Sequence, residues 1–399
     1  MTGQPQHVVV VGAGLGGIRT AEQLRTAGFR GKISLVGAEQ HLPYDRPPLS
    51  KQVLTGEWDF ERIVLCDKAR LDELGISARF GEPAVALHDG AVELADGTRL
   101  QGDAIVAATG VAARRLPDQP DTARTLRTLD DTLALQNALA TARSLLIVGA
   151  GFVGAEVAGA ARARGVDVTV LEAMPVPFTR ALGPEIGAVC ARLLTESGVD
   201  LRTGALLERF TGGSAVELAD GTRLDADVML VGIGGVPELG WLASTGIDTS
   251  DGMPCDARGR VEGVAGMWAV GDIAAWTDPV RGGRHRSEHW TNATDQAAAV
   301  ARDIVGADAP PLSTPYFWSD QFGLKIQLVG RPDLADTVLP LHGAGLDSGP
   351  VKGTVAAYFA GARLVGVVGF GAARLIARYR GLVGREADRA EVLALATSE

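Results

Sequence analysis

The chain has 399 residues, of which 46% are hydrophobic and 22% charged, and its formal net charge is −10 at pH 7. This length allows two or three domains with cores of their own, and the composition is ordinary for a globular protein. The acidic balance argues against a nucleic-acid partner, which normally requires a basic surface, although it does not exclude a local basic patch.

No apolar run reaches the roughly 18 residues of a membrane-spanning helix, and the polar segment 1–7 leaves no room for a signal peptide. We therefore expect a cytoplasmic protein without a membrane segment. The cysteines are Cys66, Cys190 and Cys255, at wide spacings. No two of them have the spacing of a metal-ligating or redox-active pair, so we expect reduced core or surface residues and no metal site.

The apolar run 8–11 predicts a first strand, and the turn GAGLGG follows it directly. Its glycines are Gly12, Gly14, Gly16 and Gly17, and helical periodicity follows. In a strand–turn–helix context, the pattern G-x-G-x-x-G indicates a dinucleotide site. One glycine permits the tight turn, one lets backbone N–H groups reach the pyrophosphate, and one lets the helix pack on the strand.

A second strand is predicted at 33–36, and an acidic side chain at its end usually binds the adenosine ribose. Here the chain continues with Gly37 and Ala38, so the acidic residue is displaced to Glu39. We expect Glu39 to take over the ribose contact; the alternative is a plain surface carboxylate.

The nine residues VELADGTRL occur at 92–100 and recur letter for letter at 216–224. Alternating apolar and polar residues flank Asp-Gly in both copies, which predicts a hairpin with a primed turn. Common hairpin chemistry could produce this twice by accident. The place of each copy behind a glycine turn favours a duplicated nucleotide-binding module instead.

The second glycine turn, GAGFVG, follows the apolar run 145–148 and contains Gly149, Gly151 and Gly154. A helical stretch follows it too, so the chain has two signatures in the same context. We therefore expect the protein to bind two dinucleotides.

Glu172 ends the next predicted strand of this second module, at 168–171. A carboxylate there accepts the ribose hydroxyls but repels a 2′-phosphate. No Arg or Lys follows until Arg180, so we expect NADH rather than NADPH to bind.

The remaining elements complete a three-part plan. Apolar strands are expected at 227–235 and 267–272, a helix at 295–304, a linker at 309–315, and short strands with a final helix beyond 317. The predicted fold class is α/β, with two Rossmann-like domains and a small α+β C-terminal domain. The predicted boundaries are 1–112 with 239–312 for the first domain, 113–238 for the inserted second domain, and 313–399 for the C-terminal domain.

Several separate motifs resemble one family. They are the loop LPYDRPPLSK at 42–51, the strand ends Ala-Thr-Gly at 108–110 and Gly-Asp at 271–272, and Glu-His-Trp at 288–290. Together they resemble the FAD-dependent, NADH-linked ferredoxin reductases of the putidaredoxin reductase and dioxygenase type. The resemblance covers nearly the whole chain. It implies a glutathione-reductase-like architecture with an FAD domain, an inserted NAD domain and a C-terminal domain at the flavin face.

The resemblance also implies site residues. For non-covalently bound FAD these are Gly12, Gly14, Gly16, Gly17, Glu39, Arg46, Lys51, Ala84, Arg127, Asp272 and Trp290. For NADH they are Gly149, Gly151, Gly154, Glu156, Glu172 and Gly234. Ala84 would meet the adenine through its backbone, Asp272 would bind the ribityl chain as a buried carboxylate, and Trp290 would lie against the flavin ring.

Lys51 and Glu156 are the implied catalytic pair at the flavin edge. A lysine there would stabilise reduced, anionic flavin, and a carboxylate would neutralise the lysine. Without the resemblance, a solvated surface lysine and a glutamate on a helix face would be the simpler interpretation.

Disulfide reductases of this architecture carry a cysteine pair just after the first module's loop, where this chain has Leu49, Ser50 and Lys51. Electrons must therefore leave the flavin for an outside acceptor. We expect a [2Fe–2S] or similar ferredoxin that feeds a cytochrome P450 or a ring-hydroxylating oxygenase. The alternatives are a rubredoxin reductase, an NADH oxidase, or an NADH sensor resembling apoptosis-inducing factor.

A ferredoxin is usually acidic, as this chain is, so docking requires a local basic patch. We expect Arg281, Arg284 and Arg286 to form it. A solvated loop of arginines is the alternative. The sequence leaves a monomer and a homodimer equally open.

Overall fold

The computed structural model describes residues 5–397. These residues form two compact units, which the chain visits alternately. The described parts of the first unit are 5–45, 60–112 and 236–313, and those of the second are 46–59, 113–235 and 314–397. Strands β8 (Val111–Ala113) and β17 (Gly235–Pro237) lie where the chain passes from one unit to the other.

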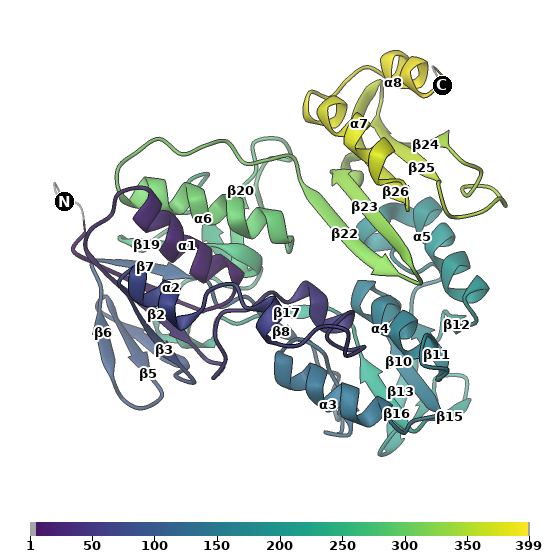
Figure 1. Ribbon diagram of the computed structural model, residues 1–399, viewed down its shortest axis with the longest axis horizontal. Coiled ribbons are helices and arrows are strands. Elements are labelled where there is room, and N and C mark those ends of the chain that lie inside the picture. The colour runs from purple at the N-terminus through teal and green to yellow at the C-terminus, as the bar shows by residue number, and fades with distance from the viewer. Residues whose placement is uncertain (1–4, 398–399) are drawn as a thin grey trace. The chain divides into compact units, whose positions relative to one another are not determined.

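A five-stranded parallel sheet forms the centre of the first unit, in the order β19-β7-β1-β2-β3. Its strands are β1 (His7–Val11), β2 (Lys32–Gly37), β3 (Ile76–Phe80), β7 (Ala104–Ala107) and β19 (Met267–Ala269). The valines of β1 are all buried, as expected for an inner strand covered on both faces. Helices α1 (Leu15–Thr26) and α6 (Trp290–Ile304) pack side by side in this unit (Figure 1).

Shorter elements complete the first unit. They are α2 (Lys68–Glu73), the sheet of β4 (Ala84–His88), β5 (Ala91–Leu94) and β6 (Arg99–Gln101), the sheet of β18 (Met253–Cys255), β20 (Ala274–Thr277) and β21 (Arg284–Arg286), and 3₁₀ turns at Glu61–Ile63, Gly240–Thr245 and Gly271–Ile273.

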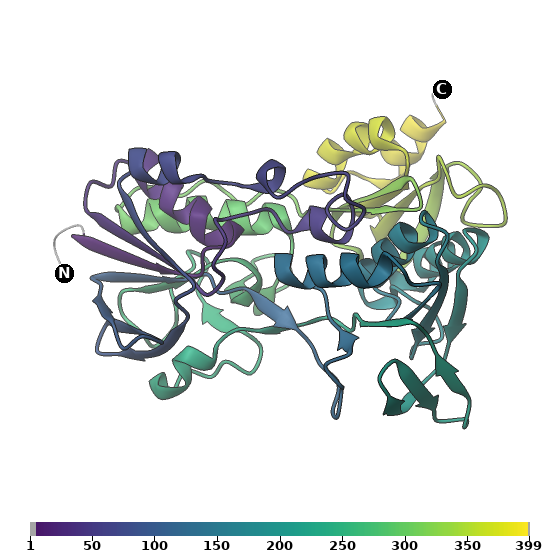
Figure 2. The ribbon, with the colours of Figure 1, turned by 60° about the horizontal axis from the view of Figure 1, so that its bottom comes forward.

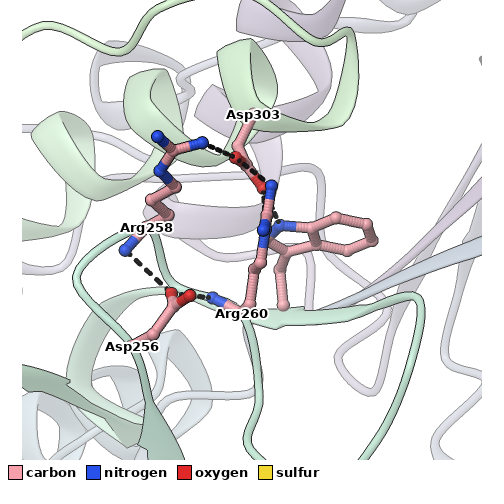
Figure 3. A network of polar contacts seen from close by, with 5 residues as sticks. Asp256, Arg258, Arg260 and Asp303 are labelled. Atoms are coloured by element: carbon pink, nitrogen blue, oxygen red, sulfur yellow. Dashed lines mark hydrogen bonds and ion pairs between the residues drawn. The ribbon is translucent and has the colours of Figure 1, made fainter.

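A polar network around a buried carboxylate fastens α6 to the neighbouring segments. The side chain of Asp303, near the end of α6, is 4% exposed. Arg260 donates from Nε to Oδ2 at 2.6 Å and from Nη2 to Oδ1 at 2.7 Å, and Trp268 Nε1 donates to Oδ2 at 2.9 Å. Arg258 adds a contact of 3.5 Å (Figure 3). Burial alone would raise the pKa of Asp303, but these donors and charges outweigh it and hold the pKa below its usual value.

The second unit contains a parallel sheet of its own, in the order β12-β11-β10-β16-β9. Its strands are β9 (Ala123–Arg124), β10 (Ser144–Val148), β11 (Asp167–Glu172), β12 (Asp200–Thr203) and β16 (Val228–Val231). Its helices are α3 (Leu129–Leu139), α4 (Phe152–Arg162) and α5 (Thr179–Glu196). Helix α3 begins at a capping box in which Thr128 and Asp131 each accept a backbone N–H of the other.

An antiparallel sheet with two helices forms the C-terminal part of the second unit, in the order β22-β23-β26-β25-β24. Its elements are β22 (Tyr316–Gln321), β23 (Leu324–Gly330), the 3₁₀ turn Pro332–Leu334, β24 (Thr337–His342), β25 (Val355–Ala360), β26 (Arg363–Phe370), α7 (Ala373–Gly384) and α8 (Arg389–Ala396). Within this unit β22 packs against α4, and so does the 3₁₀ turn Pro47–Ser50.

The repeated nine-residue segment forms a hairpin in each unit, but its turn differs from the prediction. The second copy lies in the sheet of β13 (Leu207–Gly212), β14 (Ala215–Leu218) and β15 (Arg223–Asp225), which can be followed with β5 and β6 in Figure 2. Positive φ occurs at Gly97 (83°) and Gly221 (82°) but not at the preceding aspartates. A type I′ turn needs positive φ at both central residues, and a type II′ turn needs it at the first, which is the aspartate here. The prediction of such a turn is therefore wrong, and each hairpin has a three-residue loop that ends in a left-handed glycine.

Helix α6 starts at Trp290, five residues before the predicted start at Asp295. His289 occupies the N-cap and makes no side-chain cap hydrogen bond there, so the sequence lacks the usual start signal. Among the described residues, no helix combines the length and apolarity that a membrane crossing requires.

All three cysteines are free and buried, as expected for core residues. Burial raises the pKa of the Cys66 thiol to about 11 and that of Cys255 to about 12, and it also raises that of Cys190. A buried thiol held in its neutral form is a poor redox nucleophile.

Candidate functional site

The first glycine turn has the geometry of a phosphate cradle. Gly12 has φ of +110° and donates its N–H to the Val36 carbonyl at 2.8 Å, and a Cβ on it would overlap the Ala108 carbonyl oxygen. A Cβ on Gly17 would overlap the carbonyl oxygen of Gly12 itself, so this glycine allows α1 to pack on the turn. A Cβ on Gly14, in contrast, would meet no atom within 4 Å.

Gly14 is also the N-cap of α1, and no side chain caps this helix. The first N–H groups of α1 therefore have no side-chain acceptor. The space that a Cβ of Gly14 would occupy beside them is open. This donor set fits the pyrophosphate of a dinucleotide such as FAD. Gly16 has a packing role, since a Cβ there would lie 3.2 Å from Cγ2 of Val270.

The second glycine turn repeats this geometry within the second unit. Gly149 has φ of +107° and donates to the Leu171 carbonyl at 2.7 Å, and a Cβ on Gly154 would overlap the Gly149 carbonyl oxygen. Gly151 is the N-cap of α4, again without a side-chain cap, and a Cβ on it would meet only the Gly232 carbonyl oxygen, at 4.0 Å. These residues fit a second pyrophosphate.

Glu172 ends β11 beside this second turn. Its Oε2 accepts the N–H of Ala150, inside the turn, at 2.9 Å, and its Oε1 accepts the N–H of Met174 at 2.9 Å. Each carboxylate oxygen keeps a further lone pair for a ribose hydroxyl. Gly234, with φ of +101°, lies just beyond β16, and its carbonyl accepts the N–H of Arg114 at 2.9 Å.

The corresponding end of β2 in the first unit is arranged differently. Ala38 has no acceptor side chain, and Oε2 of Glu39 accepts the Tyr44 hydroxyl at 2.5 Å. The carbonyl of Glu39 accepts the N–H of Gly81 at 2.9 Å, which holds the segment before Ala84 next to the end of β2. Glu39 and the half-buried Ala84 are thus brought to the same edge of the first unit's sheet.

Asp272 and Trp290 both lie in the first unit. Trp290 Nε1 donates to Oδ1 of Asp45, in the loop after β2, at 2.8 Å. Asp272 is half-buried rather than buried as predicted, although Gly271 and Ile273, on either side of it in the 3₁₀ turn after β19, are buried. Its carbonyl oxygen accepts Nη1 of Arg286 at 2.6 Å.

Lys51 and Glu156 form an ion pair in the second unit, with Nζ 2.9 Å from Oε2. Their side chains are 10% and 6% exposed, so Lys51 is not the solvated surface lysine of the simpler interpretation, although Glu156 does lie on a helix. Lys51 follows the 3₁₀ turn Pro47–Ser50, and Nζ also donates to the Pro47 carbonyl at 2.8 Å. Two residues 105 positions apart in the sequence are therefore paired where little water reaches them.

Arg46 and Arg127 also meet in the second unit. Nη1 of Arg46 donates to the carbonyl oxygen of Arg127 at 2.6 Å, and the N–H of Arg127 donates to Oδ2 of Asp131 at 2.9 Å. Asp131, part of the capping box of α3, therefore also orients Arg127, whose carbonyl oxygen accepts the hydrogen bond from Arg46.

The three arginines of the predicted docking patch all have carboxylate partners. Arg281 pairs with Asp278 at 3.2 Å, Arg284 with Glu262 at 2.9 Å, and Arg286 with Glu288 at 2.8 Å. The side chains of Arg281 and Arg286 are only 21% and 19% exposed, whereas that of Arg284 is 45% exposed. Most of the positive charge expected from this segment is thus compensated locally.

Sequence reasoning missed three polar residues around Glu156. Ser50 Oγ donates to Oε2 of Glu156 at 2.5 Å, and Ser319 Oγ donates to Oε1 at 2.5 Å. Gln321 Nε2 donates in turn to Ser319 Oγ at 3.1 Å. The only sequence signal was that Ser319 and Gln321 are polar and two residues apart in a strand, which places them on the same face.

Comparison with known proteins agrees with these cradles. Residues 6–297 match the family model described as pyridine nucleotide-disulphide oxidoreductase, and residues 316–398 match the model described as reductase C-terminal. The chain belongs to this oxidoreductase family. Within it, the resemblance to the FAD-dependent ferredoxin reductases is confirmed by relatives of that kind.

Two such relatives are rhodocoxin reductase of Rhodococcus erythropolis and the ferredoxin reductase component of chlorobenzene dioxygenase from Cupriavidus sp. (strain PS12). The first is 37% identical over 376 residues, which cover 90% of this chain and 85% of the relative. The second is 40% identical over 333 residues, covering 81% and 80%. Among solved structures, the covalent putidaredoxin reductase–putidaredoxin complex matches with a TM-score of 0.91 at 28% identity, over 99% of both chains. The predicted α/β fold class, with two Rossmann-like domains and a C-terminal domain, is confirmed.

Proposed function

We propose that this protein is an NADH-dependent ferredoxin reductase that carries FAD. When bound, FAD accepts a hydride from NADH and releases its electrons one at a time. The observation that carries the proposal is the ion pair between Lys51, directly after the 3₁₀ turn Pro47–Ser50, and Glu156, on α4. Neither this turn nor α4 contains a cysteine. The family is named for disulphide chemistry, yet all three cysteines are free and buried at other places in the chain. Electrons therefore pass to an external acceptor.

The chain's own residues bind and orient the two nucleotides in this proposal. The turn at Gly12–Gly17 holds the FAD pyrophosphate, with contributions from Glu39, Ala84, Asp272 and Trp290 in the first unit. Arg46, Lys51 and Arg127 also contact FAD.

The turn at Gly149–Gly154 binds NADH together with Glu172 and Gly234. The carboxylate of Glu172, fixed by two backbone donors, accepts ribose hydroxyls and disfavours the 2′-phosphate of NADPH. Lys51 supplies a positive charge where negative charge develops on reduction, and Glu156 holds that ammonium in place.

The acceptor we propose is a [2Fe–2S] or similar ferredoxin that serves a cytochrome P450 or a ring-hydroxylating oxygenase. The names of two relatives connect those proteins with a ferredoxin and a dioxygenase. Of the three proposed docking arginines, Arg284 is best suited to contact a partner because it is the most exposed. Arg281 and Arg286, whose side chains are 21% and 19% exposed, belong to the same proposed patch. We also propose an FAD domain of 1–112 with 239–312, an NAD domain of 113–238 and a C-terminal domain of 313–399.

The test is NADH-driven cytochrome c reduction by the purified, FAD-loaded protein, with and without an added [2Fe–2S] ferredoxin. Strong stimulation by the ferredoxin is expected, with NADH preferred to NADPH. Rapid bleaching of the flavin by NADH without stimulation by any of several ferredoxins would reject the ferredoxin and leave another acceptor or a sensor. A protein that does not bind FAD would reject the whole proposal.

A further inference from the structure

The first strand of the C-terminal sheet presents two buried polar side chains to α4. Ser319 and Gln321 lie two residues apart on β22 and are 0% and 1% exposed. Polar groups at that depth are costly unless they are hydrogen-bonded. Most of the surrounding core is apolar, so their presence calls for a specific partner.

That partner is Glu156 on α4, a buried carboxylate with donors on both oxygens. Ser319 occupies Oε1, while Ser50 and Lys51 share Oε2. The donors come from two segments that are distant in the sequence, namely the 3₁₀ turn Pro47–Ser50 with the lysine after it and strand β22, and the acceptor lies on helix α4. All of them belong to the second unit.

The direction of these hydrogen bonds follows from Gln321. Its Nε2 can only donate, so the Ser319 oxygen accepts there and the Ser319 hydroxyl proton points to Glu156. Ser319 is therefore fixed as a donor. A terminal carboxylate torsion is soft, and a donor on Oε1 determines where Oε2 lies.

The position of Oε2 in turn determines the position of the Lys51 ammonium. Two of its three N–H groups donate to Glu156 and to the Pro47 carbonyl. The third N–H group of Lys51 has no acceptor among residues 5–397, and the two hydrogen bonds of the other N–H groups set its direction. Loss of the donor on Oε1 would let the carboxylate rotate and the ammonium move with it.

We propose that Ser319, oriented by Gln321, is a positioning residue that holds Glu156 and thereby aims Lys51. This inference rests on the proposed function, in which Lys51 acts on the flavin. It gives the C-terminal domain a part in flavin reduction in addition to any role in partner docking.

The experiment uses the FAD-loaded protein and compares Ser319→Ala with Ser319→Thr, which restores a hydroxyl on a residue suited to a strand. The rate of flavin bleaching at saturating NADH should fall about tenfold in Ser319→Ala, the scale of one hydrogen bond to a charged group. The dissociation constant of NADH should change little. The midpoint potential of the flavin, titrated without NADH, should become more negative, and Ser319→Thr should recover both properties.

Thr354→Val is the matched structural control. Thr354, the residue before β25, is also fully buried. Its hydroxyl donates to the Pro350 carbonyl at 3.2 Å and accepts the N–H of Gly345 at 3.0 Å, and it is not bonded to Glu156. Its loss should lower stability without changing the rate or the potential. An equal effect of Thr354→Val, or wild-type rate and potential in Ser319→Ala, would overturn the inference.

Gln321→Met is a second test of the inference, for use if Ser319→Ala does not fold, because it removes the donor that orients Ser319. Oε1 of Gln321 is buried without a hydrogen-bond partner, so removing the amide leaves fewer unsatisfied groups. It should slow bleaching in the same direction by a smaller factor, and an unchanged rate and potential would contradict the inference. Lys51→Met distinguishes failure of this inference from failure of the proposed function. If Lys51→Met leaves the bleaching rate and the flavin potential unchanged, the proposed role of the Lys51–Glu156 pair fails. If Lys51→Met changes them but the Ser319 and Gln321 variants do not, the inference alone fails.

Discussion

In the first unit the helix after the glycine turn, α1, packs against another helix, α6, whereas in the second unit the corresponding helix, α4, packs against strand β22. The turns themselves share one backbone. In both, the first glycine has φ near +110° and donates to the carbonyl of the next strand. The difference lies in what covers the helix.

Each unit has a buried carboxylate on one of these helices, Asp303 on α6 and Glu156 on α4, and the two carboxylates have different surroundings. Asp303 on α6 contacts Arg260, Arg258 and Trp268, all in the first unit, and none of these three residues is proposed to bind FAD. Glu156 on α4 contacts Lys51 and two serines. One module thus uses its buried acid to fix a helix, and the other uses it to fix a lysine that we propose acts in the reaction.

The acidic residue after the second strand differs too. Glu172 braces its own glycine turn through the N–H of Ala150, whereas the first module has Ala38 at the strand end and a Glu39 bound by Tyr44. The backbone of a nucleotide cradle has therefore been kept while its side chains diverged. The divergence matches the two different nucleotides that we propose.

The largest expected effect concerns the glycines that let each helix pack on its turn. Gly17→Ala and Gly154→Ala place a Cβ into a backbone carbonyl, so each should cost more than about 3 kcal/mol of unfolding free energy. Gly17→Ala should also abolish FAD binding, while Gly154→Ala should impair NADH binding in whatever protein remains folded. Chemical denaturation and the flavin-to-protein absorbance ratio measure these effects.

The matched controls are Gly14→Ala and Gly151→Ala, where a Cβ meets open space. They should cost only about 1 kcal/mol, as for alanine at an N-cap, yet weaken FAD and NADH binding respectively. If Gly14→Ala and Gly151→Ala lower the free energy of unfolding as much as Gly17→Ala and Gly154→Ala do, Gly14 and Gly151 are required for folding rather than for phosphate binding.

The glycine turns could be predicted from the sequence because every contact that defines them is local or lies between adjacent strands. The start of α6 at Trp290 could not, since neither His289 nor its neighbours carry a capping signal. Ser319 could not either: its partner Glu156 is 163 residues away, and a serine in a strand has no chemical signature until that partner is known. The pairing of Arg284 could not be predicted either, because its partner Glu262 is 22 residues away in the sequence.

Asp303→Asn tests whether the first unit's buried acid is purely structural. It should cost about 2 kcal/mol of unfolding free energy at neutral pH, because it weakens hydrogen bonds to a charged group. FAD-loaded protein should nevertheless keep its rate of reduction by NADH.

The pH dependence of that cost has a definite sign. The pKa of Asp303 is lowered in the folded state from its usual 3.8, so its stabilisation is complete above that value and is lost as the pH falls through the lower folded value. The difference between wild type and Asp303→Asn should therefore shrink below about pH 4. A difference that stays constant down to pH 3 would contradict this account.

Glu172→Ala tests the acid that braces the second turn. Removing the carboxylate should lower kcat/KM for NADH about tenfold and raise that for NADPH, since the lost contacts are hydrogen bonds to a charged group. Glu39→Ala is the comparison in the first module, and it should leave the NADH-to-NADPH ratio unchanged while weakening FAD retention. A changed coenzyme ratio in Glu39→Ala would mean that the two acidic residues are not assigned to different nucleotides.

The smallest expected effect concerns docking of the ferredoxin. Because Arg284 is paired with Glu262, removing the positive or the negative charge should shift the KM for ferredoxin in opposite directions. Arg286 is unsuitable for this test because it also holds the carbonyl of Asp272, whereas Arg284 forms an exposed pair with Glu262. Arg284→Gln should raise the KM for ferredoxin about two- to threefold, the scale of one exposed charge. Glu262→Gln leaves Arg284 without its carboxylate and should lower that KM, and both effects should diminish at high salt. NADH-to-ferricyanide turnover should not change in either variant. Shifts of the ferredoxin KM in the same direction would show that the pair matters for local structure rather than for the charge it presents to a partner.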